Sequence, residues 1–332
     1  MSDTSTRPAV EVCGPEPRVE PVREVLAAKT VALGGSTKVR RLLPTLGRRM
    51  VGAWCFVDHY GPDDVAKAPG MQVPPHPHIG LQTVSWLLEG TVHHRDSLGS
   101  DEVIGPGELA LMTAGRGIAH AEQSPDPHAP LLHGAQLWVA LPDEARETPP
   151  RFEFHAGLPT VTGTGMRATV LLGEFAEALS PGRVHTPLVG VDVELAAGAD
   201  VVIPVEPDFE HAVLTVSGEP DIDGVLDPGT LCYLGCGRSQ LRLRAASASR
   251  FLLLGGVPFD EQIVMWWNFV GRSGDEFVGR SGDEVRSARS AWQAQITGTG
   301  PARFGEVTGY DGDPLSAPAM PPVPLRPRGR TR

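Results

Sequence analysis

The sequence predicts an all-β protein in which many short strands form barrels or sandwiches. The 39 glycines and 32 prolines together exceed a fifth of the 332 residues, whereas aromatic residues make up only 6%. This ratio suits short strands joined by tight turns better than it suits a helical bundle. Turn signals also recur about every 8–12 residues, which is the spacing that sandwiches and barrels produce.

The first half of the chain divides into a leading segment and one predicted β domain. Residues 1–18 contain prolines and glutamates but no apolar run, so we expect them to be disordered. Between residues 19 and 150, short apolar runs alternate with turns, and the clearest strands are Thr83–Leu88, Thr91–Asp96 and Leu131–Leu141. A proline-rich break from Pro142 to Pro150 ends this domain.

A second β domain is predicted over residues 151–297, with the same rhythm of strands and turns but no residue-level repeat of the first. Glycines such as Gly198 and Gly218 mark its corners. Its candidate strands are rich in β-forming residues: Met166–Gly173, Val189–Leu195, Asp200–Pro204, Ala212–Val216, Thr230–Leu234, Leu241–Arg244 and Phe251–Gly255.

One helix is predicted at the end of this second domain. Ser281 and Glu284 have the spacing of a capping box. Immediately upstream, Phe269–Glu276 (FVGRSGDE) is repeated unchanged as Phe277–Glu284, and we expect the first copy to form a turn or loop and the second to start the helix. We regard this duplication as neutral, because loops tolerate insertions. Four apolar residues follow on one face at helical spacing: Val285, Ala288, Trp292 and Ile296.

The last segment, residues 298–332, is predicted to be a C-terminal tail. Its final residues are basic, and Arg326, Arg328, Arg330 and Arg332 are separated by prolines and polar residues. We expect a solvated, disordered segment, with an arm that docks a partner protein as the alternative.

The composition excludes several classes of function. The formal net charge is −11, so direct binding to nucleic acid or to an anionic membrane is not expected. No run resembles a signal peptide or a membrane span. Cys13, Cys55, Cys232 and Cys236 match no zinc or redox spacing, so we expect reduced thiols in a cytoplasmic protein.

The chemistry is predicted to lie in the first domain, where histidines concentrate. Residues i and i+2 of a strand point to the same face, so His76 and His78 present two imidazoles together. His120 and Glu122 present an imidazole and a carboxylate in the same way, and the two pairs are expected to face each other across a barrel. Three nitrogens and one carboxylate leave open positions on an octahedral metal. A lone His-x-His is a weak signal, since loops and surfaces also use histidine.

The stretch from His76 to Gln123 resembles the pirin family of bicupins, and the resemblance extends over roughly residues 30–300. Its most diagnostic pieces are His76-Pro77-His78, Leu87–Gly90 (LLEG), Asp96–Gly99 (DSLG) and Met112–His120 (MTAGRGIAH). A later stretch, Met265–Gly271 (MWWNFVG), is similar to a sequence of bacterial members.

This resemblance implies two tandem cupin (jelly-roll-like) β-barrels with a short C-terminal helix. It also implies one Fe(II) ion bound by His76, His78, His120 and Glu122, with Mn, Ni, Cu, Co or Zn as alternatives. The general cupin pattern places a glutamate at the position of Gln82, so here Glu122 must supply the anionic ligand; Gln82 is then a hydrogen-bonding group near the ligands or a packing residue.

Residues outside the predicted ligand set are given less specific roles. We expect no metal in the second barrel, because its histidines are isolated: His155, His185 and His211. Arg116 is interpreted as steering an anionic substrate or as bracing a loop. The remaining candidates are expected to pack in the core, or between a strand and the helix: Trp86, Met112, Trp138, Trp266 and Trp267.

The resemblance implies a dioxygenase similar to quercetin 2,3-dioxygenase, acting on a small aromatic, flavonol-like substrate and O₂. In this hypothesis the metal acts as a Lewis acid and Glu122 accepts the substrate's hydroxyl proton. The alternative is a redox-sensitive, iron-dependent regulator that binds a transcription factor or metabolic enzyme. A third hypothesis is a metal-binding protein with another natural substrate.

Overall fold

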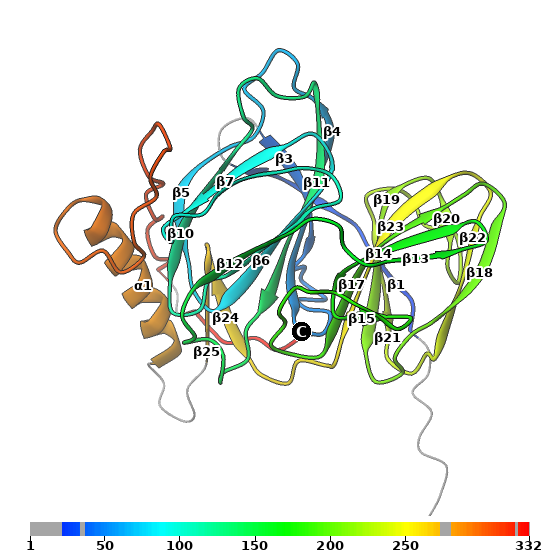
Figure 1. Ribbon diagram of the computed structural model, residues 1–332. Helices are drawn as coiled ribbons and strands as arrows, with labels where there is room; N and C mark the ends of the chain where they lie inside the picture. The colour runs from blue at the N-terminus through cyan, green and yellow to red at the C-terminus, as the bar shows by residue number, and fades with distance from the viewer. Residues whose placement is uncertain (1–21, 34–36, 273–279, 323–324, 332) are drawn as a thin grey trace, which may run out of the picture.

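Two antiparallel β-barrels lie side by side in the computed structural model, which describes residues 22–33, 37–272, 280–322 and 325–331 (Figure 1). The described residues contain twenty-five strands and one helix, so the predicted fold class, two cupin barrels with a short C-terminal helix, is confirmed. The one helix among these residues is not long and apolar enough to cross a membrane.

The first barrel consists of a seven-stranded and a four-stranded sheet. Their orders are β12-β9-β6-β11-β4-β3-β2 and β5-β10-β7-β8, and apolar side chains from both sheets, such as Val73 and Leu87, pack together in one cluster. The strands are β2 (Lys29–Leu33), β3 (Thr37–Leu43), β4 (Trp54–Asp64), β5 (Gln72–His78), β6 (Leu81–Glu89), β7 (Val92–Asp96), β8 (Asp101–Ile104), β9 (Leu109–Thr113), β10 (Ile118–Gln123), β11 (Leu131–Ala140) and β12 (Arg151–His155).

The second barrel has a seven-stranded sheet, β1-β21-β19-β23-β17-β14-β13, a three-stranded sheet, β18-β22-β20, and a separate hairpin, β15-β16. All seven strands predicted from its sequence are present. The strands are β1 (Glu24–Leu26), β13 (Thr160–Gly163), β14 (Met166–Leu172), β15 (Glu174–Phe175), β16 (Ala178–Leu179), β17 (Leu188–Leu195), β18 (Ala199–Pro204), β19 (Glu210–Ser217), β20 (Pro220–Asp221), β21 (Leu231–Gly235), β22 (Gln240–Ala245) and β23 (Ser249–Gly256).

Two short strands cross between the halves of the chain. Strand β1, near the N-terminus, pairs with β21 of the second barrel, while β12, which follows the proline-rich break, pairs with β9 of the first. The division at residue 150 stays a prediction, and strand pairing does not follow it at these two places.

The chain returns to the first barrel after β23. Strands β24 (Ile263–Trp266) and β25 (Phe269–Arg272) form a hairpin, and helix α1 (Arg280–Ile296) packs beside it on the outer side of the first barrel (Figure 1). The predicted helical stripe is confirmed, since Val285, Ala288 and Trp292 are buried there.

The duplicated octapeptide differs in structure between its copies. The first copy begins as strand β25, with Phe269 and Val270 fully buried, so the prediction of a turn or loop was wrong for these residues. Strand pairing with β24 and burial of two apolar side chains decide this conformation. Residues 273–279 lie outside the described part of the chain, as does the side chain of Ser281, so the capping box is not tested.

The C-terminal segment packs on the protein instead of forming a solvated tail, which corrects the prediction for its described residues. Phe304 is buried against α1, and the backbone of Leu315 donates a hydrogen bond to the Pro75 carbonyl. Further on, the Arg330 guanidinium forms a 2.7 Å ion pair with the buried Glu210 of the second barrel. This segment therefore contacts both barrels.

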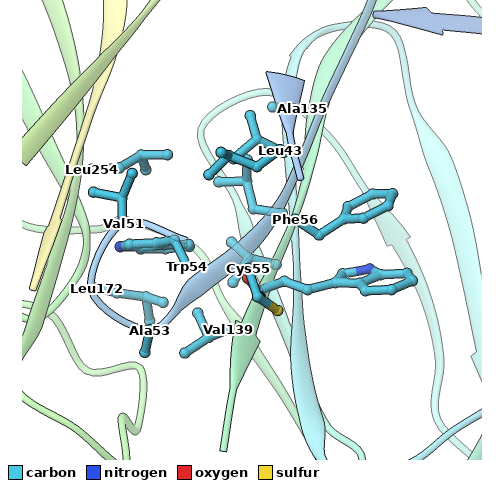
Figure 2. Packing of buried hydrophobic residues seen from close by; sticks show 14 of the residues in the cluster. Leu43, Val51, Ala53, Trp54, Cys55, Phe56, Ala135, Val139, Leu172 and Leu254 are labelled. Carbon is cyan, nitrogen blue, oxygen red and sulfur yellow. Dashed lines mark hydrogen bonds between the residues drawn. The ribbon is translucent and has the colours of Figure 1, made fainter. Parts of the chain in front are cut away.

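One apolar cluster extends from the first barrel into the second. Trp54 of β4 lies beside Val51, with Leu172 and Leu254 of the second barrel around it (Figure 2), and its indole nitrogen donates to the Gly255 carbonyl at 3.1 Å. Gly52 has a φ of 51°, and a Cβ there would lie 2.8 Å from the Gly256 Cα. A glycine is required at this point because the two backbones meet.

Candidate metal centre

Six polar side chains gather on one face of the four-stranded sheet of the first barrel. Antiparallel pairing places His120 of β10 opposite His76 of β5 and opposite Asp96 of β7, and Glu122 opposite His94. Directly opposed residues share a face of a sheet, and so do residues i and i+2. The predicted pairs therefore lie side by side on neighbouring strands, which corrects the expectation that they face each other across the barrel.

Three imidazoles converge in this group. The donor atoms of His76, His78 and His120 all lie within 4.8 Å of one another, and the three rings are nearly inaccessible to solvent. The His76 Nδ1 lies 2.8 Å from the Pro74 carbonyl and the His78 Nδ1 lies 3.1 Å from that of Asn268. A carbonyl only accepts hydrogen bonds, so each ring is protonated at Nδ1 and presents the lone pair of Nε2.

The electrostatics keep these imidazoles neutral. Burial lowers the pKa of His76 to about 4, with a further lowering from His94 that the Pro74 carbonyl opposes. Burial and the neighbouring rings also hold the pKa values of His78 and His120 well below their ordinary value. Neutral imidazoles are the protonation state that binds a metal ion.

Glu122 lies beside this cluster and not within the same group of three. Its carboxylate forms a second group with His94 and His120, whose donor atoms lie within 4.8 Å of one another. The Ser85 hydroxyl donates to Glu122 Oε1 at 2.9 Å, and burial raises the pKa of the carboxyl group. The structure thus brings the predicted residues into one neighbourhood, with the carboxylate turned toward β6 and β7.

Sequence reasoning missed His94 and Asp96. The His94 Nδ1 lies 3.4 Å from the His120 Nδ1, and its Nε2 lies 3.3 Å from Asp96 Oδ2. Burial raises the pKa of Asp96, but hydrogen bonds from His94 and Ser100 outweigh this and leave it lowered. The i, i+2 spacing of His94 and Asp96 on a strand was a usable signal.

A cavity of about 570 Å³ opens onto the cluster and has aromatic walls. Trp138 stacks on Phe56 with ring centroids 4.0 Å apart and meets the His78 ring edge-on at 5.2 Å. Trp266 and Trp267, expected only to pack, also line the cavity. On the polar side Arg41 forms a 2.7 Å ion pair with the buried Asp58.

Other candidates lie away from the cavity. Arg116 is exposed and absent from the lining residues. Trp86 and Met112 are buried in the core, as expected. The Gln82 amide donates to the Thr113 hydroxyl and the Arg183 carbonyl, both at 2.9 Å, so its hydrogen bonds run to other partners than the imidazoles.

The second barrel carries no comparable cluster among the residues that the structure describes. Of the three isolated histidines, His155 lies on β12, which pairs with β9 of the first barrel, and contacts Glu153 at 3.4 Å. Among the described residues, His185 and His211 join no group of three metal-binding side chains. The donor set that can hold a metal ion is therefore confined, in the described chain, to the first barrel.

Two barrels in one chain, with one such donor set in the first, define a bicupin. The family model Pirin matches residues 36–139, and the model of the Pirin C-terminal cupin domain matches residues 190–297. The chain belongs to the pirin family.

Relatives over most of the length agree with this assignment. A Pseudomonas aeruginosa protein named "Putative quercetin 2,3-dioxygenase PA1205" is 43% identical over 92% of each chain. Pirin of Homo sapiens is 31% identical over 68% of this chain and 79% of its own length. The crystal structure of quercetin 2,3-dioxygenase from Acinetobacter baumannii has a TM-score of 0.84 and 40% identity, covering 92% of this chain and 97% of that one.

Proposed function

We propose that this protein is a metal-dependent dioxygenase that opens a small aromatic, flavonol-like substrate with O₂ in the first barrel. The observation that carries the proposal is the convergence of three neutral, buried imidazoles at the end of a cavity with aromatic walls. The names of the Pseudomonas and Acinetobacter relatives support the same reaction class.

The proposed ligands are His76, His78, His120 and Glu122, and the proposed metal is iron. The side chains fit a divalent cation, because donor atoms of His76, His78 and His120 lie within 4.8 Å of one another, and the 3.0 Å contact between the Nε2 atoms of His78 and His120 can hold either a cation or the proton of one neutral ring. Nitrogen ligands with one carboxylate suit Fe as well as Mn, Co, Ni, Cu and Zn, so the donor set alone does not select iron. A bound metal would act as a Lewis acid toward a substrate hydroxyl and bring substrate and O₂ together.

Glu122 is the proposed proton acceptor. Its pKa is raised by burial, which makes the carboxylate a stronger base than one in water. The Ser85 hydroxyl holds one carboxylate oxygen at 2.9 Å and fixes its orientation. A substrate hydroxyl that enters the cavity next to His120 can deliver its proton to the other oxygen.

The walls of the cavity bind and orient a planar ring. Trp138 is held rigid by its stacking on Phe56, and Trp267 supplies a second aromatic surface. Lys29 and Arg41 also line the cavity, and because Arg41 is paired with Asp58, Lys29 is the cation that favours a substrate that becomes anionic on losing its proton. The apolar surface excludes water from the reacting atoms.

The decisive experiment loads metal-free protein anaerobically with Fe(II) and measures O₂ uptake with quercetin. We expect multiple turnovers in the wild type, and none in His78→Ala. His155→Ala, a half-buried histidine of β12 outside the cavity, serves as the matched control and keeps both metal and turnover.

A lack of turnover would distinguish the dioxygenase from the two alternatives, a regulator and an enzyme with another substrate. One equivalent of bound iron without O₂ uptake on quercetin contradicts the flavonol dioxygenase and favours the regulator or another substrate. The regulator requires a protein partner whose binding differs between the Fe(II) and Fe(III) forms, which affinity capture with both forms measures.

A further inference from the structure

A second cavity, of about 530 Å³, lies in the C-terminal barrel, away from the candidate metal centre. Its size falls in the usual range for small-molecule sites, roughly 300–1,000 Å³. Most of its lining is apolar, and includes Phe175, Val189, Phe209 and Leu253. An apolar cavity of this size within a barrel can enclose the body of a small organic molecule.

His211 of β19 gives this cavity a buried polar group. The side chain is only 1% exposed, and its Nδ1 makes no hydrogen bond of regular geometry among the described residues, although backbone groups of Gly235 and Phe209 lie close enough to raise the pKa of the ring. Buried polar atoms are nearly always paired, so an imidazole that is held this weakly in the lining of a cavity can take a polar group of a ligand as an additional partner.

The neighbouring strand β23 leaves space for the imidazole ring of His211. A Cβ on Gly255 of β23 would lie 2.8 Å from the His211 Cδ2, so only a glycine accommodates the imidazole there. The Cδ2 edge faces that strand, and the Nδ1 edge is the opposite edge of the ring. Burial, with a smaller contribution from Arg238, lowers the pKa of His211 to about 4, so the ring is neutral near pH 7.

The hairpin β15-β16 contributes a strained turn to the lining. Ala176 and Glu177, the two loop residues between the paired Phe175 and Ala178, have φ values of 46° and 67°. Hairpin turns of this kind normally contain Asn-Gly, because other side chains are strained at positive φ. Strain of this kind concentrates at ligand sites.

The charge of this cavity differs from that of the first. The exposed carboxylates of Glu174, Glu177 and Glu206 are among its lining groups, and no lysine or arginine of the described chain lines it. The first cavity is lined by side chains of both charges, Lys29 and Arg41 together with Asp58 and Glu122. An acidic, apolar cavity attracts cations and repels anions.

We propose that the C-terminal barrel is a binding site for a small apolar amine, protonated at neutral pH. The apolar body lies against Val189 and Leu253, His211 pairs with a polar group of the ligand, and the carboxylates near Glu177 attract the ammonium group. No metal takes part, because these carboxylates and His211 form no group of three donors in the described structure.

The test uses three probes with similar skeletons: 2-phenylethylamine, 2-phenylethanol and 3-phenylpropionate. Binding to the full-length protein is followed by NMR of methyl groups, with Val189 and Leu253 reporting on the second cavity and Leu315 on the first. We expect shifts at Val189 and Leu253, and at least tenfold weaker binding of the anion. The same amine binding is expected in His78→Ala, which separates this site from the metal centre.

Two sets of variants sharpen the test. The double variant Glu174→Gln, Glu177→Gln changes only exposed residues, and we expect roughly tenfold weaker amine binding, at about threefold per lost carboxylate. Glu194→Gln, exposed on the same barrel outside the cavity, should bind like the wild type. His211→Phe keeps a ring but removes Nδ1, and is expected to weaken binding about tenfold.

The proposal is overturned if no probe binds, if the anion binds as tightly as the amine, or if the shifts appear at Leu315 and disappear in His78→Ala. Unchanged affinity in the Glu174, Glu177 double variant also overturns it, and this result does not depend on the folding of His211→Phe.

Discussion

The Nε2 atoms of His78 and His120 lie 3.0 Å apart, although 42 positions separate the residues in the sequence. Strand pairing between β5 and β10 produces this contact, since Ile118 is opposite His78 and His120 is opposite His76. Both rings are buried, and their low pKa values keep them neutral, which is the protonation state that the proposed metal site requires. The predictions below test its supporting residues, its cavity and the packing of the two barrels.

Asp96→Asn is expected to lower the metal affinity roughly tenfold, as loss of a group that orients a ligand commonly does. Asp96 lies 3.3 Å from the His94 Nε2, and His94 in turn faces the Nδ1 of His120. Competition with a chelator measures the affinity. The control is Asp101→Asn, an exposed carboxylate that contacts His93, and equal losses in both variants would contradict the prediction.

Trp267→Ala is expected to raise the dissociation constant for quercetin roughly 3- to 10-fold while the metal content stays unchanged. The indole lines the cavity, and an aromatic contact with a planar ring contributes about 0.5–1.5 kcal/mol. Fluorescence titration of the metal-loaded protein measures the affinity. Trp267→Phe should restore most of it; a parallel loss of metal would instead assign Trp267 to the stability of the centre.

Asp192→Ala is expected to lower the free energy of unfolding by about 3 kcal/mol, because it leaves buried partners unpaired. Asp192 accepts a hydrogen bond from the Trp86 indole of the first barrel at 2.8 Å and pairs with Arg250 at 2.6 Å. Denaturation by urea measures the change. Asp200→Ala removes an Arg–Asp pair that is exposed and should leave the midpoint almost unchanged; similar effects of both changes would refute this.

The stability of the metal-free protein is expected to fall on acidification, in part through His211. Its pKa is about 4 in the folded chain and about 6.5 when unfolded, so between these values the unfolded chain binds a proton that the folded chain does not. This contribution to stability is complete above pH 6.5 and is lost as the pH falls toward 4.

In the variant His211→Phe, the side chain at this position binds no proton in either the folded or the unfolded chain. Its free energy of unfolding, relative to the wild type, should therefore rise by about 2 kcal/mol between pH 7 and pH 5, at about 1.4 kcal/mol per pH unit. Urea denaturation at a series of pH values measures both curves. A difference between the two proteins that does not change with pH would mean that folding does not lower the pKa of His211.

The sequence by itself determined the β class, the strands of the second barrel and the two i, i+2 pairs of the candidate metal centre. These features are local. Turn residues fix where strands end, and alternation along a strand fixes that His76 and His78 share a face. The helical stripe of Val285, Ala288 and Trp292 was readable for the same reason.

Only the tertiary structure decided which strands are neighbours, and therefore what surrounds the centre. His94 joins the site because β7 pairs with β10, and Trp267 lines the cavity because the chain returns to the first barrel after residue 256. The same long-range packing holds Arg330 against Glu210, where composition alone indicated a free tail. The alternation of residues along a strand specifies the face on which a side chain lies. Burial of apolar residues that are distant in the sequence specifies which strands become neighbours, and therefore which side chains lie beside it.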